Sequence, residues 1–334
     1  CREQRIMIAM QPAAAYIASD RRHALATGHS LPEETIGATL FADISGFTPL
    51  TTALVHSYGP RRGADELTRQ LNLVYTALIS EVERYGGSVI GFSGDAITCW
   101  FAAQPAPGEP TLADAIRNAV TAALAMQEVM KYYQRIRLPD SSTVTLAIKT
   151  AVAAGSARRF TVGDPTIQLI DVLAGATLDR MAATEQMAQQ GELLLDEPTA
   201  NLLLAEVTLA AWRTNSATAE RFAVVGALKQ PAAPLLPPPS TPLPEAAAKA
   251  WVLPPVYARL QNEGGRFLAE LRPAAALFLK FTGLDYDRDR EAATKLDQYI
   301  RWVQGIVNHY EGALIQLTTG DKGSYLYAAF GAPI

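Results

Sequence analysis

The sequence has little cysteine, little histidine and no long hydrophobic run, and each shortage excludes a class of protein. It holds two cysteines, Cys1 and Cys99, among 334 residues, which excludes a disulfide framework and fits a reducing compartment. The four histidines show no zinc-ligand spacing. The apolar runs are too short to span a bilayer, so we expect no membrane span and a cytoplasmic location.

An excess of charge of one sign is also missing. The chain has 29 Lys and Arg against 33 Asp and Glu, a net charge of −4 and a pI of about 5.7. This balance lacks the basic character that binds a phosphate backbone, so we expect no nucleic-acid partner. The absence of a Walker A sequence argues against a P-loop ATPase. The length is sufficient for two globular domains.

The most informative feature that is present is an internal repeat. Residues 38–50 (ATLFADISGFTPL) resemble residues 275–287 (AALFLKFTGLDYD), and residues 85–101 resemble residues 310–330. Between these matches, apolar residues recur every three or four positions in both copies, which predicts a helix. These apolar residues are Leu67, Leu71, Val74, Leu78 and Val82 in the first copy and Leu296, Tyr299, Ile300, Val303 and Val307 in the second. Each copy therefore predicts a strand, a loop, a long helix and a hairpin.

Further elements follow only in the first copy. We predict helices over 111–135 and 178–189 and strands over 143–155, 166–173 and 191–196. The resulting order, β-α-β-β-α-β with additions, predicts an α+β fold of the ferredoxin-like (split βαβ) kind, with helices on an antiparallel sheet.

A proline-rich segment separates the copies. Residues 231–244 hold seven prolines, which favour an extended, semi-rigid spacer, and the EAAAK that follows favours a helix. We predict an N-terminal extension (1–34), a first domain (35–228), a linker with a helix (229–269) and the truncated start of a second domain (270–334). The acidic DYDRD near the start of the second domain lacks the glycine and glutamate of an EF-hand loop, which indicates a solvated loop.

Two aspartates stand at places where chemistry is expected. Asp43 ends an apolar strand before the loop ISGFT, whose free N–H groups and following helix suit phosphate. Asp95 lies in the turn of the later hairpin. Taken singly, Asp43 fits a helix N-cap and Asp95 a turn residue. Taken together, at adjacent strand ends beside a phosphate loop, they predict a site for divalent cations.

These segments resemble a known family. DISGFT (43–48), the long helix after it and GGSVIGFSGDA (86–96) are similar to class III nucleotidyl cyclases. The tandem layout and DKGSYLYAAFG (321–331) resemble soluble adenylyl cyclases and their bacterial relatives. The resemblance covers nearly all of residues 30–334. It implies that two homologous domains pair head to tail within the chain and build sites at their interface.

The resemblance also implies roles for single residues. Asp43 and Asp95, with the Ile44 carbonyl assisting, would hold two Mg²⁺ ions, with Mn²⁺ as a substitute. The loop would hold the β- and γ-phosphates of the nucleotide, and Lys149 on a later strand would meet the triphosphate. Lys322 would read the purine, and a lysine donor suits N1 of adenine. The loop residues are Ser45, Gly46, Phe47 and Thr48.

The two copies differ at the implied site residues. Lys280 stands where the first copy has Asp43, so the second copy cannot hold the metals. Asp179 and Ala183 stand where the family has its transition-state asparagine and arginine, and Arg180 is kept beside them. We therefore expect one active site and one degenerate site. Gly91 replaces a lysine that soluble adenylyl cyclases carry, which puts bicarbonate control in question.

The implied reaction forms cyclic AMP and pyrophosphate from ATP by two-metal catalysis, in intracellular signalling. The 3′-hydroxyl of the ribose attacks the α-phosphorus and pyrophosphate leaves in line. Two alternatives are an inactive regulatory pseudocyclase that binds nucleotide and a guanylyl cyclase. Because part of the second copy is missing, we expect residues 1–334 alone to be nearly inactive.

Overall fold

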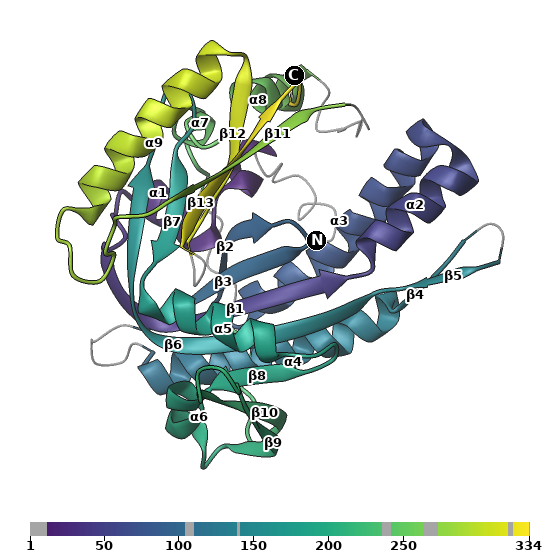
Figure 1. Ribbon diagram of the computed structural model, residues 1–334, viewed down its shortest axis with the longest axis vertical. Helices are drawn as coiled ribbons and strands as arrows, with labels where there is room; N and C mark the ends of the chain where they lie inside the picture. The colour runs from purple at the N-terminus through teal and green to yellow at the C-terminus, as the bar shows by residue number, and fades with distance from the viewer. Residues whose placement is uncertain are drawn as a thin grey trace.

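A large sheet forms the centre of the molecule (Figure 1). The structure, a computed structural model, describes residues 12–103, 110–138, 141–235, 242–262, 273–319 and 323–333. The strand order is β2-β3-β1-β6-β8-β10-β9, with β7 paired to β6, and every pairing is antiparallel except that of β6 with β8. The strands are β1 (Glu34–Ser45), β2 (Ser88–Ser93), β3 (Ala96–Ala103), β6 (Ala147–Val162), β7 (Ile170–Ala174), β8 (Leu193–Asp196), β9 (Val207–Thr214) and β10 (Arg221–Leu228).

Strand β1 shows how the two faces of the sheet are built. Its side chains alternate, as a strand requires. Leu40 and Ile44 are fully buried in the main core, which also contains apolar residues of α4. Thr39 and Phe41 instead lie on the other face of the sheet, where Thr39 donates a hydrogen bond to Met181 of α5. The helices are α2 (Phe47–Tyr58), α3 (Pro60–Arg84), α4 (Leu112–Tyr133), α5 (Ala176–Met187) and α6 (Glu197–Leu203).

Two projections extend from one end of this sheet. The helix pair α2/α3 and the ribbon of β4 (Arg135–Arg137) and β5 (Thr143–Thr145) reach in the same direction (Figure 1). Strand β1 leads into α2 through Gly46 alone, so the end of the strand lies directly at the base of the helix pair.

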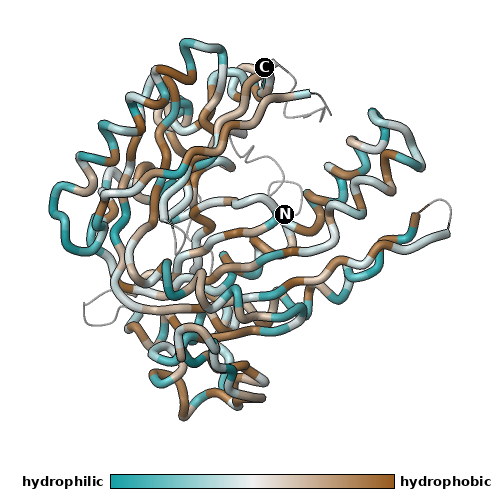
Figure 2. Tube along the Cα trace, viewed as in Figure 1, coloured by the Kyte–Doolittle hydropathy of each residue, from teal (hydrophilic) through white to brown (hydrophobic). Residues whose placement is uncertain are grey.

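The second copy forms its own small sheet in the order β11-β13-β12. The equivalent strands of the first copy have the same order, β1-β3-β2, which supports the repeat. Figure 2 shows hydrophobic and hydrophilic residues alternating along α9. The hydrophobic side packs with Phe160, Val162 and Val172 of the first copy, so one core joins the two copies. The elements are β11 (Ala275–Phe281), α9 (Ala292–His309), β12 (Gly312–Thr318) and β13 (Ser324–Phe330).

The N-terminal segment and the linker pack against each other. Ile17, Leu243, Trp251 and Val252 belong to one small core, separate from the main one. The four elements here are η1 (Pro12–Tyr16), α1 (Ser19–Thr27), α7 (Glu245–Lys249) and α8 (Pro254–Asn262). The domain limits given above stay a prediction.

The predicted fold class is confirmed, with small differences in the elements. The strand predicted over 143–155 is two strands, β5 and β6, interrupted at the buried Leu146. The strand predicted over 166–173 begins only at Ile170, because Asp164 accepts two hydrogen bonds from Thr166 and makes a turn.

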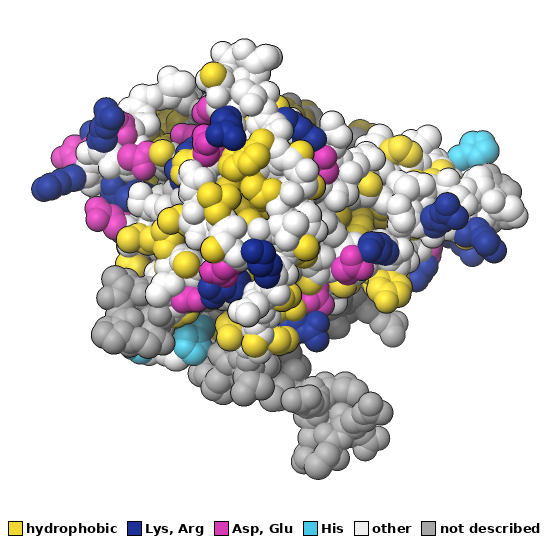
Figure 3. Space-filling view, turned by 90° about the horizontal axis from the view of Figure 1, so that it is seen from below, with side chains coloured by type: hydrophobic (Ala, Val, Ile, Leu, Met, Phe, Trp, Pro, Cys, Tyr) yellow, Lys and Arg dark blue, Asp and Glu magenta, His cyan; other side chains and the backbone are white. Residues whose placement is uncertain are grey.

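Acidic and basic side chains alternate over the face seen in Figure 3. Within the described residues, no helix is both long and apolar enough to cross a bilayer.

Candidate metal and phosphate site

The sheet brings Asp43 and Asp95 to the same end of two neighbouring strands. Asp43 lies in β1 directly opposite Ala96, the first residue of β3. Asp95 immediately precedes Ala96, in a two-residue hairpin turn whose first residue, Gly94, has a φ of 60°. A glycine at this position is the preference of a type II′ turn. The alternative role for Asp43, a helix N-cap, does not apply, since the residue before α2 is Gly46.

The Asp95 carboxyl is affected by burial and by the charge of Asp43. Partial burial of the Asp95 carboxyl raises its pKa, and the neighbouring charge of Asp43 raises it further. Tyr75 of α3 lies beside both and donates a hydrogen bond to the Asp95 carbonyl at 3.2 Å. Burial, together with the charges of Asp95 and Asp43, raises the pKa of Tyr75 to about 12. Two like charges so close together form a place that a cation would stabilise.

The start of α2 follows a tight turn at a glycine. Gly46 has a φ of 107°, and a Cβ at this position would lie 2.4 Å from the Thr145 carbonyl oxygen. Glycine is therefore required for β1 to turn so tightly into the helix. The first backbone N–H groups of α2 have no partner within the helix. Ser45 accepts a hydrogen bond from Gln190 at 2.9 Å, and its hydroxyl oxygen lies 3.4 Å from the Ala147 carbonyl oxygen.

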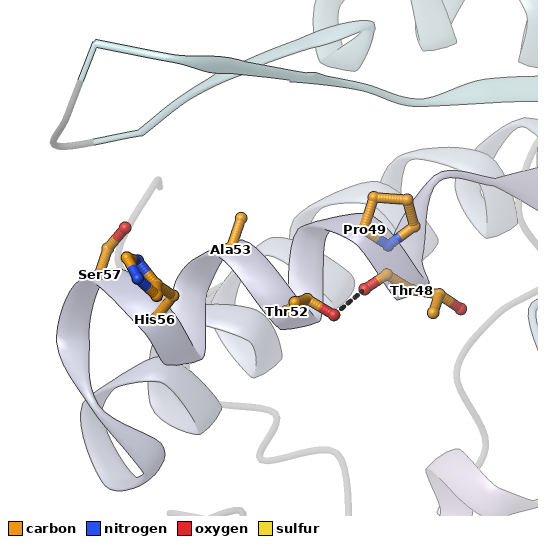
Figure 4. A pocket seen from close by; sticks show the side chains of 6 residues that line it. All are labelled: Thr48, Pro49, Thr52, Ala53, His56 and Ser57. Atoms are coloured by element: carbon orange, nitrogen blue, oxygen red, sulfur yellow. Dashed lines mark hydrogen bonds between the residues drawn. The ribbon is translucent and has the colours of Figure 1, made fainter.

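A groove follows the outer side of α2 (Figure 4). It is lined by Thr48, Pro49, Thr52, Ala53, His56 and Ser57. Thr52 donates a hydrogen bond to the Thr48 carbonyl, as Figure 4 shows. Neither Asp43 nor Asp95 lines this groove, which shares only Thr48 with the predicted phosphate loop.

Lys149 lies beside Asp43, on the neighbouring strand β6. The two residues are directly opposite in the β1–β6 pairing, and Lys149 Nζ is 3.4 Å from Asp43 Oδ2. The same ammonium is 2.5 Å from Glu185 Oε1 on α5. Burial lowers the pKa of Lys149, but its bonds and charge interactions with Glu185 and Asp43 outweigh burial and raise the pKa overall. Lys149 is therefore not a solvated lysine, and Glu185 is a neighbour that no sequence motif indicates.

A second pocket, of about 210 Å³, lies between the copies. Asp179 of the first copy lines it together with the loop after β11 in the second copy. Asp179 is the only residue of the predicted degenerate site among its lining residues. Its lining residues are Gly175, Asp179, Phe281, Thr282, Gly283, Leu284, Tyr286, Thr319, Gly323 and Ser324.

The other residues of the predicted degenerate site do not line this pocket. Arg180 turns toward the sheet, where it donates a hydrogen bond to the Ala154 carbonyl at 2.5 Å and lies 3.2 Å from Asp196. Ala183 packs against a separate small core with Phe222. Lys280 is exposed on β11, next to Gly323. Lys322, the predicted purine contact, lies outside the described residues.

No family model matches the chain. It is 22% identical to human adenylate cyclase type 10 over 343 residues, which cover 92% of this chain and 20% of the human protein. The rabbit protein of the same name is 21% identical over 89% of this chain and 19% of its own length. The chain is a homologue of adenylate cyclase type 10. It spans about a fifth of the length of these cyclases.

Solved cyclase structures are similar to this cyclase homologue at low identity. A bacterial light-regulated adenylyl cyclase aligns over 67% of this chain and 63% of its own, at 16% identity and a TM-score of 0.49. The adenylyl cyclase CyaB from P. aeruginosa aligns over 57% of this chain and 94% of its own, at 20% identity and a TM-score of 0.47. The guanylate cyclase domain of RhGC from Catenaria anguillulae, in complex with GTP, aligns over 59% of this chain and 100% of its own, at 18% identity and a TM-score of 0.46.

Proposed function

We propose that this chain holds the metal- and phosphate-binding half of a nucleotidyl cyclase site, which forms cyclic AMP and pyrophosphate from ATP. The observation that carries the proposal is the placement of Asp43 and Asp95 at one end of two paired strands, close enough for the charge of Asp43 to raise the pKa of Asp95. The similarity to adenylate cyclase type 10 supports it.

The donor set fits Mg²⁺ or Mn²⁺. Two carboxylates and the predicted Ile44 carbonyl offer only oxygen, the ligand that hard divalent cations prefer. In the described part of the chain, no group of three or more His, Cys, Asp or Glu side chains is placed to hold a metal ion. The protein thus supplies few ligands, which suits an ion that keeps waters and binds substrate phosphates. When bound, two such ions would lower the pKa of the attacking hydroxyl and offset charge on the phosphates.

The remaining residues orient the triphosphate. The N–H groups at the start of α2 would donate to phosphate oxygens, and Gly46 lets β1 deliver them next to Asp43. Lys149 would offset phosphate charge from the opposite strand. The proposal has four further parts. They are a purine contact from Lys322, intramolecular pairing of complete domains at this site, a role in signalling and a cytoplasmic location.

The test measures metal-dependent nucleotide binding by the chain. Calorimetry gives the affinity for ATP and for GTP in the presence of Mn²⁺. Binding is the primary measurement because we expect little turnover from these residues alone. D43N and D95N should each weaken ATP binding at least about ten-fold, a loss of about 1.4 kcal/mol. E128Q, an exposed charge change on α4, is the matched control.

Three outcomes separate the candidates. An adenylyl cyclase site is supported if the wild type binds ATP more tightly than GTP and if D43N and D95N weaken ATP binding. The reverse preference would make the site a guanylyl cyclase site. Equal binding by the wild type, D43N and D95N would contradict the proposal. Cyclic nucleotide in the same samples, measured with Mg²⁺ and Mn²⁺, distinguishes a cyclase from a pseudocyclase that only binds.

A further inference from the structure

Lys149 is held between two carboxylates rather than one. Its Nζ lies 2.5 Å from Glu185 Oε1 and 3.4 Å from Asp43 Oδ2. All three side chains are largely shielded from water, with 24% of Lys149, 21% of Glu185 and 32% of Asp43 exposed. The ammonium is therefore paired more closely with the helix α5 than with the carboxylate proposed to hold a metal.

Glu185 is fixed in place by the packing of α5. Leu178 and Met181 of this helix are buried against Trp100 and Ala153 on the sheet. At its first residue the helix also donates a hydrogen bond, from the Ala176 N–H to Asp287 of the second copy. A carboxylate on a helix held at both positions can position its partner precisely, because it has few alternative arrangements.

A lysine on Asp43 and a divalent cation compete for the same oxygens. A salt-bridged Asp43 would have to give up the ammonium before it could accept the ion, and the remaining positive charge would repel the ion. A second carboxylate that pairs with the ammonium removes both difficulties. It supplies the lysine with another partner and cancels its charge.

We propose that Glu185 is a positioning residue that draws Lys149 away from Asp43 and compensates its charge, so that Asp43 can accept a divalent cation while Lys149 stays within reach of the phosphates. This inference rests on the proposed function. It assigns to α5 a part in metal binding that the repeat and the motifs do not indicate.

The test is a double-mutant cycle on Mn²⁺ binding without nucleotide, measured on the full chain by the electron paramagnetic resonance signal of free Mn²⁺. E185Q should weaken Mn²⁺ binding about ten-fold, the size expected for an uncompensated charge a few ångströms away. K149A should strengthen it. In the K149A background, E185Q should change the affinity by no more than about two-fold, because the ammonium that Glu185 compensates is gone.

Two matched variants control for charge and fold. E128Q removes the same charge from an exposed ion pair with Lys131 and should leave Mn²⁺ binding unchanged. E185D keeps the carboxylate and should recover part of the affinity lost in E185Q. Thermal unfolding of each variant shows whether its fold is intact.

The outcomes that overturn the inference are distinct from those that overturn the function. If E185Q binds Mn²⁺ like the wild type, Glu185 does not position Lys149. If E185Q costs as much in the K149A background as in the wild type, Glu185 acts directly on the ion and the inference is wrong, although a metal site exists. If D43N binds Mn²⁺ like the wild type, the proposed metal site is wrong and the inference fails with it.

Discussion

The carboxylate of Asp287, in the second copy, accepts a hydrogen bond of 3.0 Å from the backbone N–H of Ala176, in the first copy. Ala176 is the first residue of α5, and its N-cap, Gly175, supplies no side-chain hydrogen bond. The second copy thus caps a helix of the first. This contact ties the pairing of the copies to the helix that carries Asp179, Arg180 and Glu185.

Loss of this cap should destabilise the protein. D287A removes the acceptor and should lower the free energy of unfolding by about 1 kcal/mol, the usual value of an N-cap. D287N keeps an oxygen acceptor and should lose less, chiefly the attraction of the charge to the helix N-terminus. Urea denaturation measures both. D65A, at an exposed aspartate of α3, is the control, and equal stability of D287A and D65A would contradict the assigned cap.

Gln304 of α9 is predicted to be the more costly contact between the copies. Its side chain, 1% exposed, accepts from the Asp164 N–H and donates to the Gln168 carbonyl, both at 2.8 Å. Q304A would leave both backbone groups without these partners, at a cost of about 1–3 kcal/mol for each that stays buried. Q298A, at an exposed glutamine of the same helix, should change stability by less than about 0.5 kcal/mol. Urea denaturation compares the two, and equal stabilities would refute the prediction.

The sequence predicts the elements well because their signals are local. Most of the periodic apolar residues of α3 and α9 are buried in the structure, and Leu67, Leu71 and Tyr299 are partly buried. The Asp43 and Asp95 positions follow from the order of strands, since a split βαβ arrangement places β3 beside β1. Their proximity was therefore predictable.

The contacts of α5 were not predictable in the same way. Glu185 reaches Lys149 across the sheet, and Asp287 reaches Ala176 from a loop that the sequence indicates only as solvated and acidic. Neither pair shares a motif or a period, because both depend on how separate elements pack. Arg180 shows the same limit: the resemblance assigns it to the degenerate site beside Asp179, but its side chain turns to Asp196.

Gly46 allows a test of the tight turn between β1 and α2. G46A would place a Cβ 2.4 Å from the Thr145 carbonyl and force a non-glycine residue to a φ of 107°. We expect a loss of about 1–3 kcal/mol in stability from the strained backbone. We also expect weaker Mn²⁺-dependent ATP binding, because the N-terminus of α2 would move. G91A is the control, since a Cβ there meets no atom within 4 Å. Normal stability and ATP binding by G46A would show that the turn tolerates a side chain.

Asp171 of β7 anchors the N-terminal helix to the first copy, and its loss should be felt both in stability and in its dependence on pH. Arg159 and Arg21 approach its carboxylate at 2.6 and 3.1 Å, and Arg159 also pairs with Asp20 of α1. Burial alone would raise the pKa of Asp171, but the hydrogen bonds and charges of Arg159 and Arg21 outweigh it and hold the pKa below its usual range. D171N leaves two guanidinium groups without this partner and should cost about 3–5 kcal/mol.

The sign of the pH effect follows from that lowered pKa. A carboxyl whose pKa is lower in the folded than in the unfolded state contributes stability that is complete above its ordinary value of about 4 and is lost as pH falls through the folded value. The difference in unfolding free energy between the wild type and D171N should thus be constant from pH 7 to about pH 5 and shrink below pH 4. E128Q, at an exposed pair, should cost no more than about 1 kcal/mol at any of these pH values. A difference between the wild type and D171N that grows on acidification would show that the lowered pKa is wrong, since only a carboxyl with a raised pKa gains stability as pH falls.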